Sequence, residues 1–152
     1  VMSRLLEGPL RLDDHFAARH RRVRASNPYV LRNHPEKILT PFALGRKYGF
    51  EVDSELDRLL EEALPLLDRN VRVHPVLRAS FLAILGDAGG AADALTDLRR
   101  RGVLQMVIPE FDALLRLAPA DPSHQLTVGE HSIYAVRELG GMWRRRNEDE
   151  FL

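Results

Sequence analysis

The chain has no cysteine among its 152 residues. This absence excludes a disulfide-stabilised scaffold and a zinc site built on cysteine ligands. The chain also lacks an excess of charge, because 22 Lys and Arg residues face 22 Asp and Glu residues. A neutral chain argues against a dedicated nucleic-acid module or membrane-surface module. No apolar run approaches the length of a membrane span, and residues 1–10 lack the pattern of a signal peptide, so we expect a cytoplasmic protein with no membrane partner.

What the chain does have is enough length and apolar content for one domain with a real core. Hydrophobic residues make up 45% and charged residues 29%, which is ordinary globular usage. The clearest helix is expected to open at Ser54, because leucine recurs at helical spacing behind it. One face of this helix carries Leu56, Leu59, Leu60, Ala63, Leu64 and Leu67.

Further helices are expected on both sides of that one. Asn33 and Pro35 predict a helix start, Pro41 an interruption and Gly49 a stop. Other helices are predicted from Pro75 to the glycine-rich turn at Gly86, from Ala91 to Arg101 ending at Gly102, and from Pro109 to Leu117. The predicted fold class is all-α, an irregular helical bundle of about six helices with little or no strand.

Residues 10–27 are the least regular part of the chain. Asp13 and Asp14 could cap a short helix through Phe16 to Ala18. The basic cluster that follows, Arg19 to Arg24, could contact a phosphate, or it could be a solvated face or an interdomain contact.

The stretch from His124 to Val136 carries the candidate site residue, His131. Thr127 and Glu130 have the spacing of a capping box, which predicts a helix start. The residues that then recur every three or four positions are Val128, His131, Ala135, Leu139 and Met142. This stripe predicts that His131 points inward, either as a core histidine held by a backbone carbonyl or as a metal ligand. Spacing alone supplies no second ligand.

Two segments resemble a known family. Gly102 and Leu104, then Pro109 to Phe111, then the series His124, Thr127, Val128, Glu130 and His131 follow the order seen in bacterial PII uridylyltransferase and uridylyl-removing enzymes. There they lead into a metal-dependent phosphohydrolase domain of the HD type. The chain departs from that pattern at Leu126, where the family usually has an aromatic residue, and at Gly129, where it usually has Asp.

The resemblance implies a domain plan and a ligand set. Residues 1–30 would leave a preceding nucleotidyltransferase domain in an extended form, 31–122 would be a helical linker domain, and 123–152 would begin the phosphohydrolase domain. His131 would be the first ligand of a His, His-Asp, Asp metal set, yet none of the six histidines precedes an aspartate. We therefore expect a piece of a longer protein, with no catalytic or nucleotide-binding residue of its own.

Three function classes follow. The first is a fragment of a bifunctional enzyme in nitrogen signalling, whose parent would use UTP, the PII signalling protein and a divalent metal, Mg or Mn, while the fragment alone would be inactive and bind no cofactor. The second is a helical interaction or scaffold module without catalysis. The third is the helical body of a tRNA-type nucleotidyltransferase, although the expected excess of basic charge is absent. No nucleic-acid partner is expected, and apolar surface left near His131 could drive formation of a homodimer.

Overall fold

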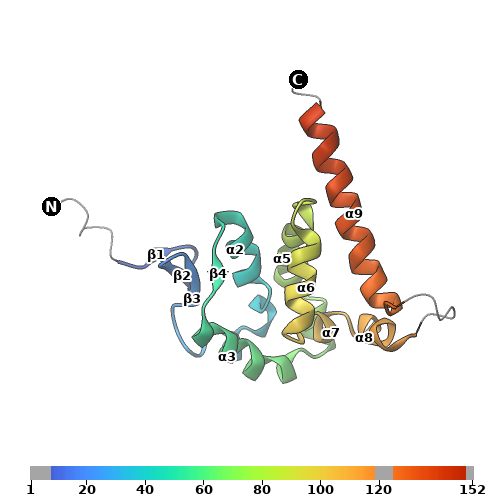
Figure 1. Ribbon diagram of the computed structural model, residues 1–152. Coiled ribbons are helices and arrows are strands. Elements are labelled where there is room, and N and C mark those ends of the chain that lie inside the picture. Colours follow the sequence, from blue (N-terminus) through green and yellow to red (C-terminus); the bar gives the residue numbers. More distant parts are fainter. Residues whose placement is uncertain (1–7, 119–124, 150–152) are drawn as a thin grey trace. The chain divides into compact units, whose positions relative to one another are not determined.

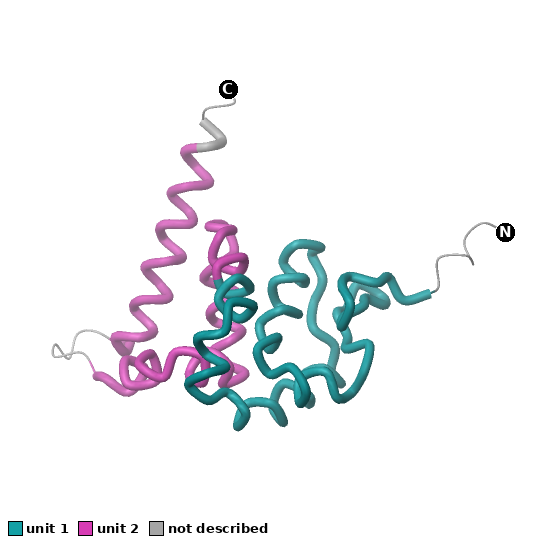
Figure 2. The backbone as a smooth tube through the Cα atoms, turned by 180° about the vertical axis from the view of Figure 1, so that it is seen from behind, with its two compact units in different colours: residues 1–81 teal, residues 82–152 magenta. Residues whose placement is uncertain are grey.

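The computed structural model describes residues 8–118 and 125–149 (Figure 1). The chain divides into two compact units, residues 1–81 and residues 82–152 (Figure 2), and each is described by itself. The division falls within helix α5, Pro75–Gly86. The three domains predicted from the resemblance stay predictions.

Unit 1 opens with a four-stranded sheet in the order β1-β2-β3-β4. Its strands are β1 (Leu10–Arg11), β2 (Phe16–Arg19), β3 (Arg22–Ala25) and β4 (Glu51–Val52). The first three strands are antiparallel, and β4 lies parallel to β3. The prediction of a mostly helical chain is confirmed, whereas the prediction of little or no strand is wrong. The described chain is better classed as α+β than as all-α.

Two local features explain why residues 10–25 form strands. The Asp13 side chain does not cap a helix; its Oδ1 accepts hydrogen bonds from the backbone N–H groups of His15 and Phe16, both at 2.7 Å, and so fixes the turn between β1 and β2. The turn between β2 and β3 consists of His20 and Arg21, with φ of 51° and 59°. Two consecutive positive φ values are the mark of the tight turn that suits the twist of a hairpin.

The helices of unit 1 are α1 (Val30–Asn33), α2 (Thr40–Tyr48), α3 (Ser54–Ala63) and α4 (Arg69–Arg72), with 3₁₀ turns at Pro35–Lys37 and Leu64–Leu66. Asn33 ends α1 rather than capping a longer helix, and Pro41 sits in the first turn of α2 instead of interrupting it. Gly49 ends α2 in the left-handed conformation, as predicted. The α3 start is also confirmed to within one residue, because the Asp53 side chain accepts from the Leu56 N–H at 2.8 Å.

The core of unit 1 lies between the sheet and these helices. Phe16 and Val23 face it from the strands, and both are fully buried. The predicted leucine stripe of α3 is also inside, with Leu56, Leu59, Leu60 and Ala63 buried. Leu67 after the 3₁₀ turn continues this core. This burial of apolar side chains is the main favourable contribution to the stability of the unit.

Unit 2 holds α6 (Ala91–Arg100), α7 (Val103–Val107), α8 (Pro109–Arg116) and α9 (Val128–Asp149). Gly102 separates α6 from α7 with a φ of 73°, so the predicted stop is confirmed. Leu98, Val103 and Leu104 form the buried centre where α6 meets α7. Over the described residues the chain has nine α-helices, three more than predicted, because several are single turns. None of the helices described is long and apolar enough to cross a membrane.

Candidate functional site

The helix that carries His131 begins where the sequence predicts. The backbone N–H of Thr127 donates to Glu130 Oε2 at 3.0 Å, and the N–H of Glu130 donates to Thr127 Oγ1 at 3.2 Å. This reciprocal pair is the predicted capping box, and it satisfies two donors that a helix start leaves free. Glu130 Oε1 also accepts from Arg99 Nη1 at 3.1 Å, which ties the start of α9 to α6.

These contacts lower the pKa of the Glu130 carboxyl from its usual value. The largest cause is the hydrogen bond from the Thr127 backbone, and the Thr127 hydroxyl and the Arg99 guanidinium add to it, while partial burial opposes them. Glu130 is therefore held as a charged carboxylate that stabilises the helix start.

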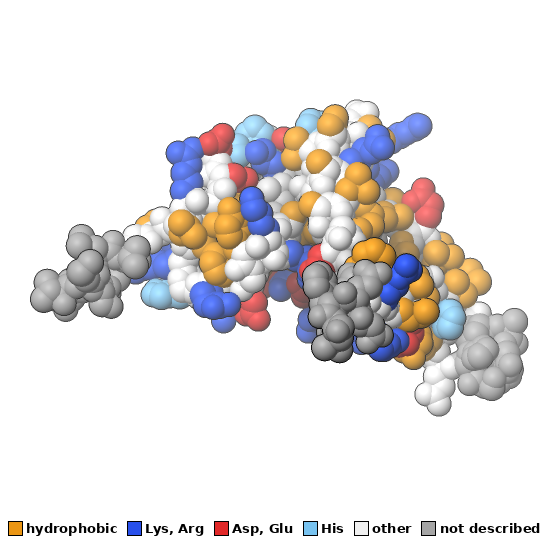
Figure 3. Space-filling model, turned by 90° about the horizontal axis from the view of Figure 1, so that it is seen from above, with side chains coloured by type: hydrophobic (Ala, Val, Ile, Leu, Met, Phe, Trp, Pro, Cys, Tyr) orange, Lys and Arg blue, Asp and Glu red, His pale blue; other side chains and the backbone are white. Residues whose placement is uncertain are grey.

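The predicted direction of His131 is wrong. Its side chain is exposed, and its ring stacks loosely on Tyr134 with centroids 6.5 Å apart. The whole stripe predicted to face inward lies on the surface, where Leu139 is 65% exposed and Met142 59%. In the space-filling view, hydrophobic side chains gather on part of the surface of unit 2 (Figure 3). Trp143 adds to this exposed apolar surface.

The buried face of α9 runs instead through Gly129, Ile133 and Gly140, whose spacings of four and seven residues mark one side of a helix. A Cβ on Gly129 would lie 2.8 Å from Leu115 Cδ2 and 3.0 Å from the Leu115 backbone nitrogen. A Cβ on Gly140 would lie 2.2 Å from the Ala88 carbonyl oxygen. Glycine thus lets α9 approach α8 and the turn after α5 within unit 2, and it leaves no room for an aspartate at position 129.

His131 has no partner for a metal ion in the part of the chain that the structure describes. No group of three or more His, Asp and Glu side chains comes together within residues 8–118 and 125–149. Glu130, the nearest carboxylate in sequence, already accepts hydrogen bonds from Thr127 and Arg99. His124, the other histidine of the sequence series, lies outside the described residues. The donors present do not make a metal site by themselves.

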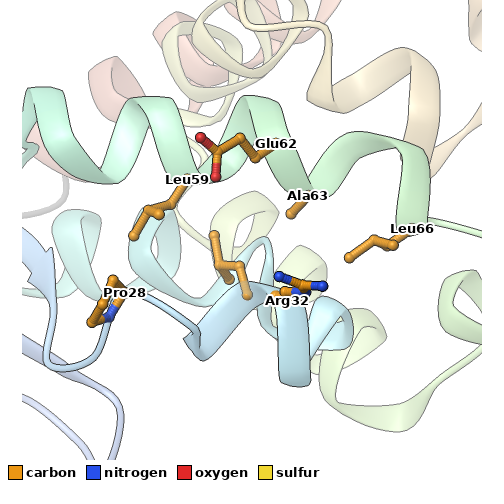
Figure 4. A pocket seen from close by; sticks show the side chains of 7 residues that line it. Pro28, Arg32, Leu59, Glu62, Ala63 and Leu66 are labelled. Atoms are coloured by element: carbon orange, nitrogen blue, oxygen red, sulfur yellow. The ribbon is translucent and has the colours of Figure 1, made fainter.

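Sequence reasoning missed two cavities in unit 1. One, of about 240 Å³, lies between α1 and α3, with Arg32 and Glu62 beside its apolar walls (Figure 4). The other, of about 210 Å³, lies at the β2–β3 turn and is lined by Arg19, His20, Arg21 and Phe50 among others. For the second cavity, the basic cluster in the sequence was an available signal. For the first cavity the sequence carries no signal, because the residues that line it are of ordinary types for helices.

Comparison with known proteins places the chain in a family. Residues 16–106 match the family model described as uridylyltransferase GlnD third domain. The chain belongs to the GlnD third-domain family. It is 32% identical over 135 residues to the bifunctional uridylyltransferase/uridylyl-removing enzyme of Thiobacillus denitrificans, covering 86% of this chain and 16% of that protein.

A second relative of the GlnD family, the bifunctional uridylyltransferase/uridylyl-removing enzyme of Acinetobacter baylyi, is 30% identical over 147 residues, which are 92% of this chain and 15% of that protein. The chain therefore spans about one sixth of the length of these relatives. No solved structure matches. The match to the family model begins after β1 and ends before α8 and α9. It covers strands β2 to β4, helices α1 to α6 and most of α7, and it does not reach His131.

Proposed function

We propose that this GlnD-family chain is the part of a bifunctional uridylyltransferase/uridylyl-removing enzyme that connects the transferase domain with an HD-type phosphohydrolase domain. In this proposal residues 123–152 begin the phosphohydrolase domain, and α9 presents His131 to the remainder of it. The observation that carries the proposal is the exposure of His131 beside exposed apolar side chains of α9, at the start of a helix fixed by a capping box. PII and UTP would be partners of the parent enzyme, which we place in the cytoplasm.

The metal would be divalent, Mg or Mn, and when bound it would lower the pKa of a water and stabilise charge on a phosphodiester. This chain would contribute one imidazole nitrogen. One imidazole does not retain a divalent ion against water, so we expect no metal binding by the chain alone. What the described residues do is fix the position of His131, through the Thr127–Glu130 pair and the close packing of Gly129 on Leu115.

The test is His131→Ala in the parent enzyme. The expected result is loss of hydrolysis of uridylylated PII with uridylyl transfer retained, because the two reactions would use separate domains. Ser132→Ala is the matched control, since Ser132 is the next exposed residue of α9 and should leave both reactions unchanged. A folded His131→Ala enzyme that hydrolyses uridylylated PII at the wild-type rate would contradict the metal-ligand role.

A second candidate function is that of a helical module that spaces two catalytic domains and performs no catalysis. The specific observation in its favour is that the family model matches residues 16–106, which include the leucine-rich core of unit 1. The described residues of this region form no cluster of potential metal ligands. Retention of both reactions in His131→Ala would favour this function. The third class, a tRNA-type body, would instead require binding of tRNA.

A further inference from the structure

The neutral net charge hides a separation of charge along unit 1. Residues 8–50 contain nine Lys and Arg against three Asp and Glu, whereas residues 51–68 contain seven Asp and Glu against one Arg. The first segment forms β1 to β3 with α1 and α2, and the second forms β4 and α3. Neutrality is thus a cancellation between segments and does not exclude a local charged surface.

The basic segment places two arginines opposite each other at the end of the hairpin. Arg19 of β2 pairs in register with Arg22 of β3, so both side chains leave the same face of the sheet. Both are exposed, and neither forms an ion pair within the residues that the structure describes. Arg11 and Arg24 on the same face differ, because they pair with Asp14 and Glu55. Like charges directly opposite across strands destabilise a sheet, so the Arg19–Arg22 pair costs stability. Glu51 lies beside Arg22 in the register of β3 and β4, whereas Arg19 has no acidic neighbour in register.

The turn that joins these arginines is also unfavourable by itself. Two-residue hairpin turns with positive φ favour Asn-Gly, and a left-handed conformation costs other residues about 1–2 kcal/mol each. Arg21 has a structural reason to be there: its guanidinium donates to the Gly49 carbonyl at 3.3 Å and lies 5.9 Å from the centre of the Phe50 ring. His20 has no hydrogen bond or ion pair among the described residues. Strained positions with unpaired polar side chains are typical of sites that bind something.

The cavity beside the turn indicates what would bind. Arg19, His20 and Arg21 border it, and Leu10 and Phe50 supply apolar surface. An arginine fork on an apolar base fits a carboxylate at the end of a short methylene stem, as in glutamate. A nucleic acid fits less well than a short acidic segment. A long phosphate backbone would extend past the tip and meet the exposed Glu51, which is paired with Arg22 in register, and the acidic start of α3.

We propose that the tip of the β2–β3 hairpin, residues 19–22, docks an acidic segment of a partner protein. One glutamate or aspartate side chain enters the cavity beside Phe50, and Arg19 and Arg22 pair with carboxylates of the same segment. Docking relieves the repulsion between the two arginines, which the free hairpin carries. The surface is independent of His131 and of the phosphodiester chemistry proposed above.

The probe is a fluorescein-labelled octaglutamate peptide, with binding to the whole 152-residue chain followed by fluorescence anisotropy. We expect salt-sensitive binding that weakens at least about tenfold in the double variant Arg19→Glu and Arg22→Glu. The matched control is Arg78→Glu, a single exposed arginine of α5 that should change binding little. Circular dichroism of both variants verifies that they remain folded.

The charge-reversed double variant should also gain binding to a cationic peptide, which a misfolded protein would not show. The double variant, but not the wild type, should bind labelled octalysine. The proposal is overturned if the wild type does not bind octaglutamate, if Arg78→Glu weakens binding as much as the double variant does, or if tRNA binds more tightly than the peptide and is lost in the same double variant.

Discussion

At the scale of single residues, Gly140 and Gly141 are neighbours in α9 with opposite surroundings. A Cβ on Gly140 would collide with the Ala88 backbone, which cannot move aside as a flexible side chain can. A Cβ on Gly141 would meet only Arg145 Nη1, at 3.6 Å. The same substitution should therefore have opposite effects at adjacent positions.

We predict that Gly140→Ala destabilises the chain by about 1–3 kcal/mol, because the added methyl overpacks the contact with Ala88. Gly141→Ala should stabilise it by up to about 1 kcal/mol, because alanine loses less backbone freedom than glycine in a helix. Denaturant unfolding at neutral pH measures both. Equal effects at the two positions would mean that α9 does not pack against the turn at Ala88.

A second residue-scale prediction concerns Glu130 and pH. Its folded pKa is lowered, so its contribution to stability is present above the unfolded value of about 4.3 and is lost as the pH falls through the folded value. Glu130→Gln should thus destabilise the chain near neutral pH and lose less stability on acidification than the wild type. Unfolding midpoints measured at several pH values between neutrality and strong acid give this difference.

Glu110→Gln is the control for that pH series, because Glu110 is an exposed carboxylate in the first turn of α8 with no side-chain hydrogen bond within the described residues. Its pH dependence should match the wild type more closely than that of Glu130→Gln. If the two variants behaved alike, the capping box would not be the source of the effect.

At the scale of elements, α3 supplies the most regular contribution to the core. Leu60 is 2% exposed, and Leu56 and Leu59 flank it on the same buried face. Leu60→Ala should cost about 2–5 kcal/mol, because it removes buried methyl groups and leaves a cavity. Glu61→Ala, at the next and exposed position, should change stability by less than about 0.5 kcal/mol. Thermal unfolding followed by circular dichroism distinguishes these outcomes, and a near-neutral Leu60→Ala would show that α3 buries another face.

The elements also show what the sequence could reveal and why. Helix starts and stops were predictable where a side chain or a glycine determines them, as at Thr127, Gly49 and Gly102. The β2–β3 hairpin was not predictable, because its turn is His-Arg instead of Asn-Gly and its first strand, β2, buries three consecutive residues, Phe16 to Ala18, without alternation.

The candidate site was predictable in position but not in direction. The start of α9 follows from the Thr127–Glu130 spacing, whereas its buried face follows from close approach at Gly129 and Gly140. A prediction from hydrophobic periodicity relies on large apolar side chains and gives glycine no weight. It therefore assigned the buried face to the stripe of α9 that is in fact exposed. The family match was likewise anticipated by the motifs, although it covers 16–106 and leaves His131 outside.

At the scale of the whole molecule, the exposed stripe of α9 makes the predicted homodimer testable. Val128, Leu139, Met142 and Trp143 are large apolar side chains left on the surface. We predict self-association of the isolated chain through them, measured by sedimentation equilibrium, and its loss in the double variant Leu139→Lys and Met142→Lys. Leu82→Lys is the control, because Leu82 is equally exposed on another helix. A wild type that remains monomeric at high protein concentration would refute the prediction.

The two glycine contacts of α9 fix the angle of the helix about its own long axis. Gly129 fits against Leu115 and Gly140 against Ala88, and a residue with a Cβ at either place would collide with these neighbours. Each residue of an α-helix turns it by about 100°. One residue inserted between Thr127 and Gly129 would therefore turn the capping box relative to the packed face. One residue inserted between His131 and Gly140 would turn His131 by about 100° relative to Gly140. An insertion of seven residues after His131 would nearly restore that angle, so angle and length can be varied separately in the parent enzyme.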